Sequence, residues 1–430
     1  MSYNCRLKAE GLGDAIKHAS RTQSLGNTLT NDQSKKQTQG PGNNYVTTEQ
    51  SDHKTNSHLD EPFQTNDGLE RQEHDTFVNT SKTCTKKTNL VFLKTHKTGS
   101  STVQNILMRF GSARNLTFAL PYRGHILGWP RPFHKRFVLQ ERIGMKNTTY
   151  NILCHHTRFH YDNIRDLMPD DTVYITVVRN PVYMYESVFT YNRFAKKLNI
   201  STSEPFKTFL DQPSYYIKFG KLDPLRYRNP MFYDLGNDTA ESYSEQTIKA
   251  SINRLETIFS VVMVTDYFEE SLILLKHELC WDIDDVLFFT LNARRDESIR
   301  HVTKNMARKI RQWSKIDSML FDHFNKTLWY KLSKLPFDWR QEVAVLKARN
   351  RQLQEECLQP DGMGETETQD KRFKVFKPPG ISIEGFQLRE SARINETCVG
   401  MAKPEKPFTA ELHEKVEQKI FSGEYISIVS

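Results

Sequence analysis

The amino-acid sequence predicts an α/β fold in which helices flank a central parallel sheet. Short apolar runs of strand length alternate along the middle of the chain with stretches whose apolar residues recur every three to four positions. Strands that are buried on both faces have such continuous apolar runs, and crossover helices are the usual connections between parallel strands. We therefore expect three layers, with the sheet covered on both faces.

The first predicted strand leads into a polar turn. Leu90–Leu93 is apolar, the turn KTHKTGSS covers 94–101, and a helix is expected over Val103–Phe110 with Gly111 as its end. The first turn of a helix has unpaired N–H groups and the positive end of the helix dipole. A glycine lets an anion approach the backbone, and two lysines add positive charge. This turn is therefore a candidate cradle for phosphate or sulfate.

The turn differs from the Walker A loop of P-loop NTPases. That loop has the pattern G-x-x-x-x-G-K-[ST], with its lysine after the second glycine. Here Lys97 precedes Gly99, which is the only glycine of the turn. From this stretch alone, an ordinary strand-to-helix turn with solvated lysines is an equally good interpretation.

A second strand-to-helix connection offers a fixed cation. Thr172–Val178 has the pattern of a buried strand, and Arg179 stands at its end. Pro181 suits the first turn of a helix over Val182–Phe194, on which Ser187 lies eight residues after Arg179. A cation and a hydroxyl are the groups that a second phosphate requires.

Histidines follow a third predicted strand, Tyr150–Cys154, at the end where α/β folds place ligand-binding groups. His156 and His160 have the spacing of a helical metal site, but no third ligand is nearby, so a metal site is not favoured. A packed or surface histidine is the usual role of this residue. If the reaction removes a proton from a hydroxyl, a histidine is the natural base, and we favour His156 over His160.

The alternation of strands and helices continues towards the C-terminus. Helices are expected over Ser244–Thr257 and Tyr267–Leu279, the second with Asp266 as its N-cap. A buried strand is expected between them, over Phe259–Val264. Further helices are expected within 302–335 and over 341–358.

Polar and aromatic segments supply further candidate ligands. Arg294 and Arg295 either bind phosphate groups or an anionic acceptor, or form a solvated charge pair. The segments 116–139 and 201–237 are rich in aromatic residues and prolines; we expect an irregular loop region over the first and an acceptor lid over the second. Such segments are places for acceptor contacts, with ordinary packing as the alternative for each aromatic residue.

Three regions are expected along the chain. Residues 1–87 are rich in polar residues and lack apolar periodicity, which predicts a disordered tail or stem. The folded domain is expected over 88–345. Residues 346–430 are expected to form a helix and a tail that are partly packed on this domain and contribute little chemistry.

Composition limits the choice of partners. The 430 residues carry a net charge of +8, which suits anionic ligands. No RNA-binding signature, zinc finger or long basic run is present in the sequence, so nucleic acid is not an expected partner. The six cysteines include no C-x-x-C pair, and their even number permits disulfides that the sequence does not assign. Cys154 is as readily a buried thiol as half of a bridge.

Several segments together resemble one family of enzymes. The turn KTGSS resembles the 5′-phosphosulfate loop of sulfotransferases, and Arg179 with Ser187 resembles their 3′-phosphate site. The segments LKTHKTGSST, CHHTRFHYDNI, FYDLG, YFEESLILLK and LNARRD resemble the galactose-3-O-sulfotransferase family, in the same order, over roughly residues 88–400. The resemblance implies a P-loop-like three-layer sulfotransferase fold and 3′-phosphoadenosine 5′-phosphosulfate (PAPS) as the sulfate donor.

The resemblance also implies roles for the candidate residues. His156 would be the catalytic base, with His160 as the second choice, and Lys97 would neutralise charge on the departing phosphate. The scheme needs no metal. The residues expected to bind PAPS are Lys94, Lys97, Thr98, Gly99, Ser100, Ser101, Arg179, Ser187, Arg294 and Arg295.

The implied activity is PAPS-dependent transfer of sulfate to the 3-hydroxyl of a terminal galactose, on a galactosylceramide-like glycolipid or on a glycoprotein glycan. Another carbohydrate O-sulfotransferase, such as a uronic-acid 2-O-sulfotransferase, is the alternative within the class. A P-loop nucleotide kinase is an alternative from another class, but it would need Mg²⁺ and a Walker-type lysine. An inactive descendant that only binds galactose-terminated glycans is a further alternative.

The resemblance implies membrane association in the Golgi, with a lumenal catalytic domain behind an N-terminal signal-anchor. No apolar run of the sequence approaches the ~18 residues of a membrane span, and residues 1–20 lack a signal-peptide core. We therefore expect an incomplete or alternative N-terminus, or a different route of delivery. Seven N-x-[ST] sequons would be usable in the secretory pathway: Asn79, Asn115, Asn147, Asn199, Asn237, Asn325 and Asn395.

Overall fold

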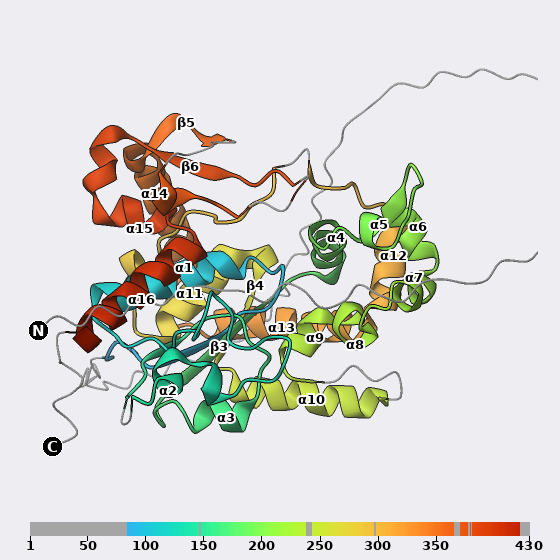
Figure 1. Cartoon of the computed structure of the whole chain (residues 1–430), viewed down its shortest axis with the longest axis horizontal. Helices are drawn as coiled ribbons and strands as arrows, with labels where there is room; N and C mark the ends of the chain where they lie inside the picture. The colour runs from blue at the N-terminus through green and yellow to red at the C-terminus, as the bar shows by residue number, and fades with distance from the viewer. Residues whose placement is uncertain are drawn as a thin grey trace, which may run out of the picture. The chain divides into compact units, whose positions relative to one another are not determined.

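The computed structural model describes residues 84–145, 148–237, 243–295, 298–364, 370–376, 379 and 381–421. Within them the predicted α/β architecture is confirmed, with a parallel sheet flanked by helices (Figure 1). The expected tail over 1–87 lies outside the described residues, apart from its last four positions. No helix in the described part of the chain is long and apolar enough to cross a membrane.

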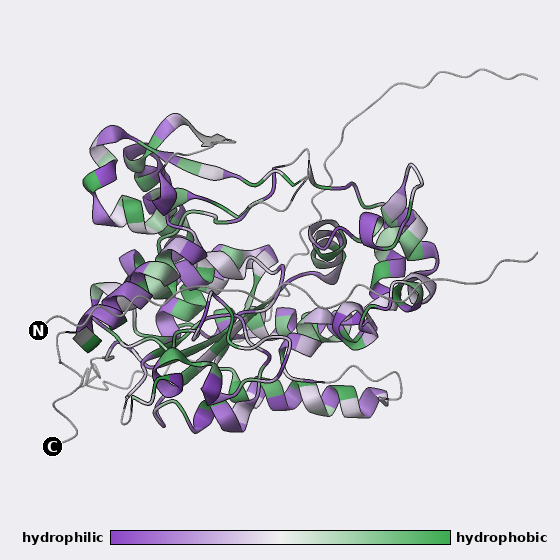
Figure 2. Ribbon diagram, in the orientation of Figure 1, coloured by the Kyte–Doolittle hydropathy of each residue, from purple (hydrophilic) through white to green (hydrophobic). Residues whose placement is uncertain are grey.

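Four parallel strands form the central sheet, in the order β2-β1-β3-β4. Their side chains are buried at every position except the first residue of β3, because helices cover both faces. Figure 2 shows the sheet as a hydrophobic centre among helices of mixed hydropathy. Each strand lies within a predicted apolar run: β1 is Leu90–Leu93, β2 is Ile152–Leu153, β3 is Val173–Val178 and β4 is Val261–Val264.

The parallel register brings four chain segments to one edge of the sheet. Leu93 pairs with Thr176, and Val178 pairs with Val264, so these strands end close together. The polar turn follows β1, the histidines follow β2, Arg179 follows β3 and Thr265 follows β4. Parallel α/β sheets bind ligands at this carboxyl edge.

The helices form the outer layers, with α1 and α16 on one side of the sheet in Figure 1 and α3 and α10 on the other. The α-helices of the described residues are α1 (Ser100–Ala113), α2 (Leu139–Arg142), α3 (Tyr161–Arg165), α4 (Pro181–Tyr191), α5 (Phe194–Lys197), α6 (Pro205–Asp211), α7 (Pro213–Phe219), α8 (Pro224–Arg228), α9 (Pro230–Asp234), α10 (Glu245–Ile258), α11 (Phe268–Glu278), α12 (Lys304–Trp313), α13 (Lys315–Ser333), α14 (Trp339–Cys357), α15 (Glu396–Ala402) and α16 (Glu405–Phe421).

The expected end of α1 and the expected cap of α11 are wrong, and the helix expected over Val182–Phe194 ends at Tyr191. Helix α1 continues past Gly111, because the missing side chain lets Phe118 and Ile152 pack there; a Cβ at Gly111 would lie 2.5 Å from the Phe118 ring. Asp266 does not cap α11. Its carboxylate instead accepts a hydrogen bond from the backbone N–H of Asn180 at 2.8 Å, which ties the end of β4 to the start of α4.

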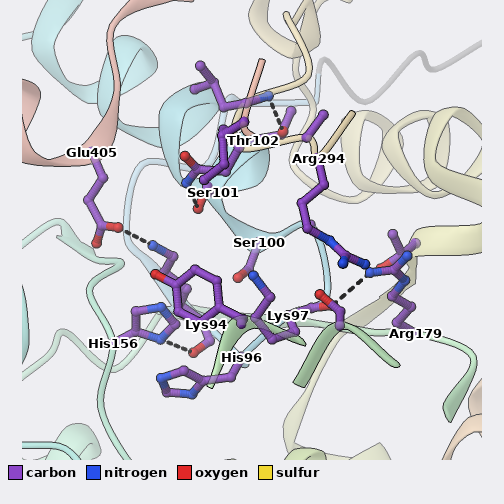
Figure 3. A pocket seen from close by; sticks show the side chains of 18 of the residues that line it. Lys94, His96, Lys97, Ser100, Ser101, Thr102, His156, Arg179, Arg294 and Glu405 are labelled. Carbon is purple, nitrogen blue, oxygen red and sulfur yellow. Dashed lines mark hydrogen bonds and ion pairs between the residues drawn. The ribbon is translucent and has the colours of Figure 1, made fainter. Parts of the chain in front are cut away.

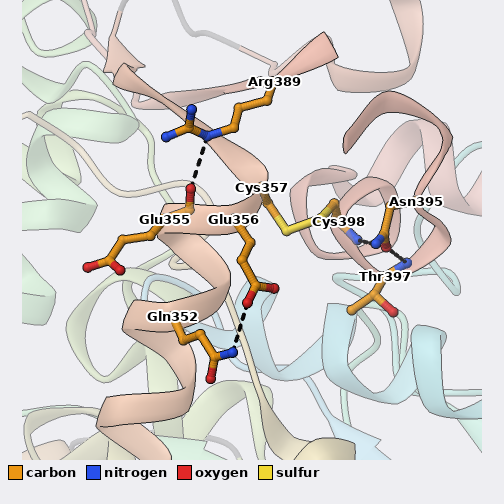
Figure 4. Close-up of a disulfide and its surroundings, with 8 residues drawn as sticks. All are labelled: Gln352, Glu355, Glu356, Cys357, Arg389, Asn395, Thr397 and Cys398. Atoms are coloured by element: carbon orange, nitrogen blue, oxygen red, sulfur yellow. Dashed lines mark hydrogen bonds between the residues drawn. A yellow bond between two sulfur atoms is a disulfide. The ribbon is translucent and has the colours of Figure 1, made fainter. Parts of the chain in front are cut away.

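The C-terminal segment is more ordered than expected. Strands β5 (Leu358–Gly364) and β6 (Gly385–Leu388) pair antiparallel, and α15 and α16 pack on α1. Two disulfides are present among the described residues, Cys84–Cys280 and Cys357–Cys398. The second joins the end of α14 to α15 (Figure 4). Cys154 is a buried free thiol.

Candidate active site

A cavity of about 690 Å³ opens at the carboxyl edge of the sheet. Its size is that of ligand pockets in general. It is lined by the turn after β1 and by the first residues of α16 (Figure 3). Four further residues complete the lining: His156, Arg179, Ser187 and Arg294. Residues that lie more than 300 positions apart in the sequence therefore share one wall.

The turn after β1 has the conformation of an anion cradle. Gly99 is left-handed, with φ of 71°, and α1 begins at the next residue. A Cβ at Gly99 would lie 3.3 Å from the Thr265 side chain, so the position favours glycine for both space and conformation. The Thr102 N–H donates to the Gly99 carbonyl at 3.1 Å, whereas the N–H groups of Ser100 and Ser101, at the start of α1, have no carbonyl one turn earlier in the helix and are left for an anion.

The hydroxyls of this turn hold the turn itself. Thr95 and Thr98 share a hydrogen bond of 2.8 Å, and the Ser100 hydroxyl donates to the Thr95 carbonyl at 2.6 Å. Ser101 Oγ accepts a hydrogen bond from the Asn292 side chain at 2.9 Å. Thr98 was expected to bind PAPS, but its side chain is fully buried and faces the turn.

Lys97 reaches the cavity from a left-handed backbone position, with φ of 63°. Its ammonium lies 3.7 Å from the centre of the Tyr191 ring, a cation–π contact that holds the charge over α4. Burial, together with the positive charges of Arg294 and Arg179, lowers the pKa of Lys97 to about 7. The group is thus held where an anion would restore its charge.

The residues predicted to bind a second phosphate lie beside Lys97. Arg179 donates to the Lys97 carbonyl at 3.1 Å, and Ser187 faces the same cavity from α4. Burial lowers the pKa of Arg179, although an arginine remains charged. Arg294 is held in the cavity wall by an ion pair with the buried carboxylate of Glu186.

His156 is fixed by the backbone. Its Nδ1 donates to the carbonyl of Lys94 at 2.9 Å, since a carbonyl can only accept, so Nε2 carries the lone pair. Burial lowers the pKa of His156 well below its ordinary value near 6.5, and the neighbouring His96 and Lys94 lower it further. The imidazole is therefore neutral at neutral pH, the form in which it can accept a proton.

The group that supports His156 was not predicted from the sequence. His96 stacks on His156 with ring centres 4.1 Å apart, and its Nδ1 lies 2.8 Å from Asp234 Oδ2. Trp129 donates to the other oxygen of Asp234 at 2.9 Å. His96 stands in the predicted turn and Asp234 in the FYDLG segment, so the sequence marked both segments but not these side chains.

Lys94 has a partner that the sequence did not indicate. Its side chain is buried, and its ammonium donates to Glu405 Oε2 at 2.6 Å. Glu405 is the first residue of α16, in the segment that was expected to contribute little chemistry. Lys94 was expected to bind PAPS, but its charge is paired with this carboxylate.

Two other candidates lie apart from the cavity. His160 is exposed and caps α3, where its Nδ1 accepts from the Asn163 N–H at 3.4 Å. Arg295 is not among the residues that line the cavity. His156 and His160 do not share a helical face, and the described residues contain no group of three or more His, Cys, Asp or Glu side chains that could hold a metal ion.

Fold and site together define an α/β protein of the sulfotransferase class, with an anion cradle and a neutral histidine in one cavity. Comparisons with known proteins agree. The profile of the galactose-3-O-sulfotransferase family matches residues 59–416. The chain is 36% identical over 338 residues to galactosylceramide sulfotransferase of Homo sapiens, covering 76% of this chain and 79% of that protein.

Other relatives have similar coverage. Galactose-3-O-sulfotransferase 2 of Sus scrofa is 38% identical over 336 residues, 76% of this chain and 83% of that protein. Galactose-3-O-sulfotransferase 3 of Mus musculus is 33% identical over 342 residues, 77% of this chain and 78% of that protein. The chain belongs to the galactose-3-O-sulfotransferase family.

Proposed function

We propose that this protein is an enzyme that transfers sulfate from PAPS to the 3-hydroxyl of a terminal galactose. One observation carries the proposal. A histidine whose Nε2 is unprotonated faces the same cavity as the Gly99 cradle and the cations Lys97 and Arg179. The names of the relatives support galactose as the acceptor.

The residues present fit a donor with two phosphate groups. The cradle at Gly99 would hold the 5′-phosphosulfate through backbone N–H groups, with Ser101 beside it. Arg179 and Ser187 would hold the 3′-phosphate, and Arg294, paired with Glu186, lies on the same wall. PAPS supplies a sulfuryl group on a phosphate leaving group, and the cavity has room for a nucleotide.

The chain itself supplies the acid–base and electrostatic parts. His156 Nε2 would take the proton of the galactose hydroxyl, and its bond to the Lys94 carbonyl keeps the ring oriented. Lys97 would place its charge at the bridging oxygen of the leaving group. His96 also has its Nδ1 held by a carboxylate, which makes it the second candidate for the base in place of His160.

We also propose the acceptor and the cellular location of this enzyme. A glycolipid such as galactosylceramide and a glycoprotein glycan both present a terminal galactose. Two disulfides support an oxidising compartment, and we propose the Golgi lumen, where the family resemblance places such enzymes.

Sulfate transfer from radiolabelled PAPS, without added metal, tests the proposal. Galactosylceramide, lactosylceramide and N-acetyllactosamine would be the acceptors, with linkage analysis of the products. Label at galactose O3 is expected, and the preferred acceptor would distinguish lipid from glycoprotein. Folded protein that binds 3′,5′-ADP but labels none of these acceptors would contradict the activity, and folded protein that does not bind 3′,5′-ADP would contradict the choice of donor.

A further inference from the structure

The two carboxylate oxygens of Glu405 have different surroundings. Its Oε2 accepts the hydrogen bond from Lys94, whereas its Oε1 is buried without a hydrogen-bond partner in the described residues. The residue lines the cavity. A buried carboxylate oxygen without a donor is costly, which marks this atom as a place where a ligand hydrogen would be stabilising.

The segment that precedes Glu405 is held in place by hydrogen bonds from α1 and by a disulfide. Asn105 of α1 donates to the carbonyls of Gly400 and Lys403, at 2.9 and 3.0 Å, at the end of α15. The disulfide Cys357–Cys398 holds α15 to α14 (Figure 4). Glu405 follows two residues after Lys403. Helix α1, whose first turn forms the anion cradle, therefore also sets the position of Glu405.

The charge of Glu405 persists in this setting. Burial alone would raise the pKa of the carboxyl, but the charge and the hydrogen bond of Lys94 lower it below its ordinary value. A carboxylate repels an anionic donor and attracts a hydroxyl hydrogen. In Figure 3, Glu405, Lys94 and His156 lie on one side of the cavity, and Arg179 and Arg294 lie on the other.

We propose that Glu405 is a residue that positions the acceptor: its Oε1 receives a hydrogen bond from a hydroxyl of the acceptor galactose other than the reacting one. The inference rests on the proposed function, because it needs a sugar beside His156. The bond aligns the ring so that the reacting hydroxyl points at His156 Nε2. It also assigns Lys94 to the acceptor side, as the cation that holds the carboxylate in place.

Glu405→Gln tests this with octyl β-galactoside and its 2-, 4- and 6-deoxy analogues as acceptors. The amide keeps the shape but replaces one accepting oxygen by a donor. We expect kcat/KM for octyl β-galactoside to fall about 10- to 100-fold, the effect of one charged hydrogen bond, with the KM for PAPS unchanged. For one deoxy analogue, the variant and the unchanged protein should have the same kcat/KM, because the contacted hydroxyl is already missing.

Glu411→Gln is the matched control, since Glu411 also lies on α16 and pairs with lysines, Lys403 and Lys415. It should leave the acceptor panel unchanged. Equal losses on all three deoxy analogues would overturn the inference, as would full recovery in Lys94→Met with Glu405→Gln, which would reduce Glu405 to a partner of Lys94. If the unchanged protein transfers sulfate to no galactoside, the proposed function fails as well.

Discussion

Lys97 is largely enclosed and lies beside the cradle, so its protonation should respond to a bound anion. Its pKa is lowered to about 7, with burial as the largest cause. An anion in the cradle favours the charged form, so binding raises this pKa. Below pH 7 the group is already protonated. Above pH 7 binding must take up a proton, so affinity falls as pH rises.

We therefore expect the affinity for 3′,5′-ADP to fall by up to about ten-fold per pH unit from pH 7 towards pH 9. Isothermal titration calorimetry in buffers of different ionisation enthalpy measures both the affinity and the proton uptake. Lys97→Arg should bind with little pH dependence in this range, because arginine stays charged. Equal slopes for the two proteins would assign the proton to another group.

His156→Asn separates the orientation of this residue from its basicity. The asparagine amide can still donate to the Lys94 carbonyl, but it has no basic nitrogen. We expect kcat to fall about 10²- to 10⁴-fold, the usual contribution of a general base, with the affinity for 3′,5′-ADP retained. His96→Asn is the paired variant, since it keeps a donor for Asp234. A larger loss in His96→Asn than in His156→Asn would make His96 the base.

At the scale of elements, α1 links the cradle to the C-terminal segment. Its first turn forms the cradle, and Asn105 one turn later holds the carbonyls at the end of α15. The disulfide Cys357–Cys398 closes a sequence separation of 41 residues around β5 and β6. Loss of this disulfide should therefore loosen the segment that carries Glu405 more than it affects the cradle.

Cys357→Ser with Cys398→Ser should lower stability by about 2–4 kcal/mol and raise the KM for the galactose acceptor, with little change in 3′,5′-ADP affinity. Thermal unfolding, acceptor kinetics and nucleotide titration check the three parts. Cys84→Ser with Cys280→Ser is the comparison, since this disulfide joins the segment before β1 to the residues after α11. An acceptor KM that rises equally in both double variants would argue against a specific role of α15.

At the scale of the whole molecule, the fold sorts the glycosylation sequons by exposure. Asn115 and Asn199 are exposed, at the ends of helices α1 and α5, whereas Asn325 lies within α13 with its Oδ1 buried. Asn79 and Asn147 lie outside the described residues. A glycosyltransferase needs an accessible side chain, which the half-buried Asn325 of α13 does not provide.

When the protein is made in a secretory host, we expect glycans at Asn115 and Asn199 and none at Asn325. Mass spectrometry of glycopeptides, before and after enzymatic deglycosylation, measures the occupancy of each site. Asn115→Gln and Asn199→Gln should each remove one glycan. Full occupancy of Asn325 would mean that glycosylation precedes the packing of α13, and absence of every glycan would argue against a secretory location.

The strands, the strand-to-helix turn at Gly99 and the placement of Arg179 and Ser187 at the next such connection could be predicted from the sequence. These features depend on local apolar runs, helix starts and neighbouring residues, so a linear pattern is enough to predict them. The order of the segments also identified the family. The polar turn made an anion site a candidate because a helix N-terminus beside a glycine suits an anion, and the other family segments were needed to favour that interpretation.

The partners of these groups depend on how distant segments pack in the folded protein. Lys94 and Lys97 are three positions apart in the sequence, yet the first ammonium pairs with Glu405 and the second faces Tyr191. His96 and Asp234 are 138 residues apart, and Lys94 and Glu405 are 311 apart. Burial and charge pairing depend on which distant segments pack together, and a single sequence holds no local pattern for that. The sheet brings the strand ends to one edge, and packing of the C-terminal helix on α1 then sets which side chains face the cavity.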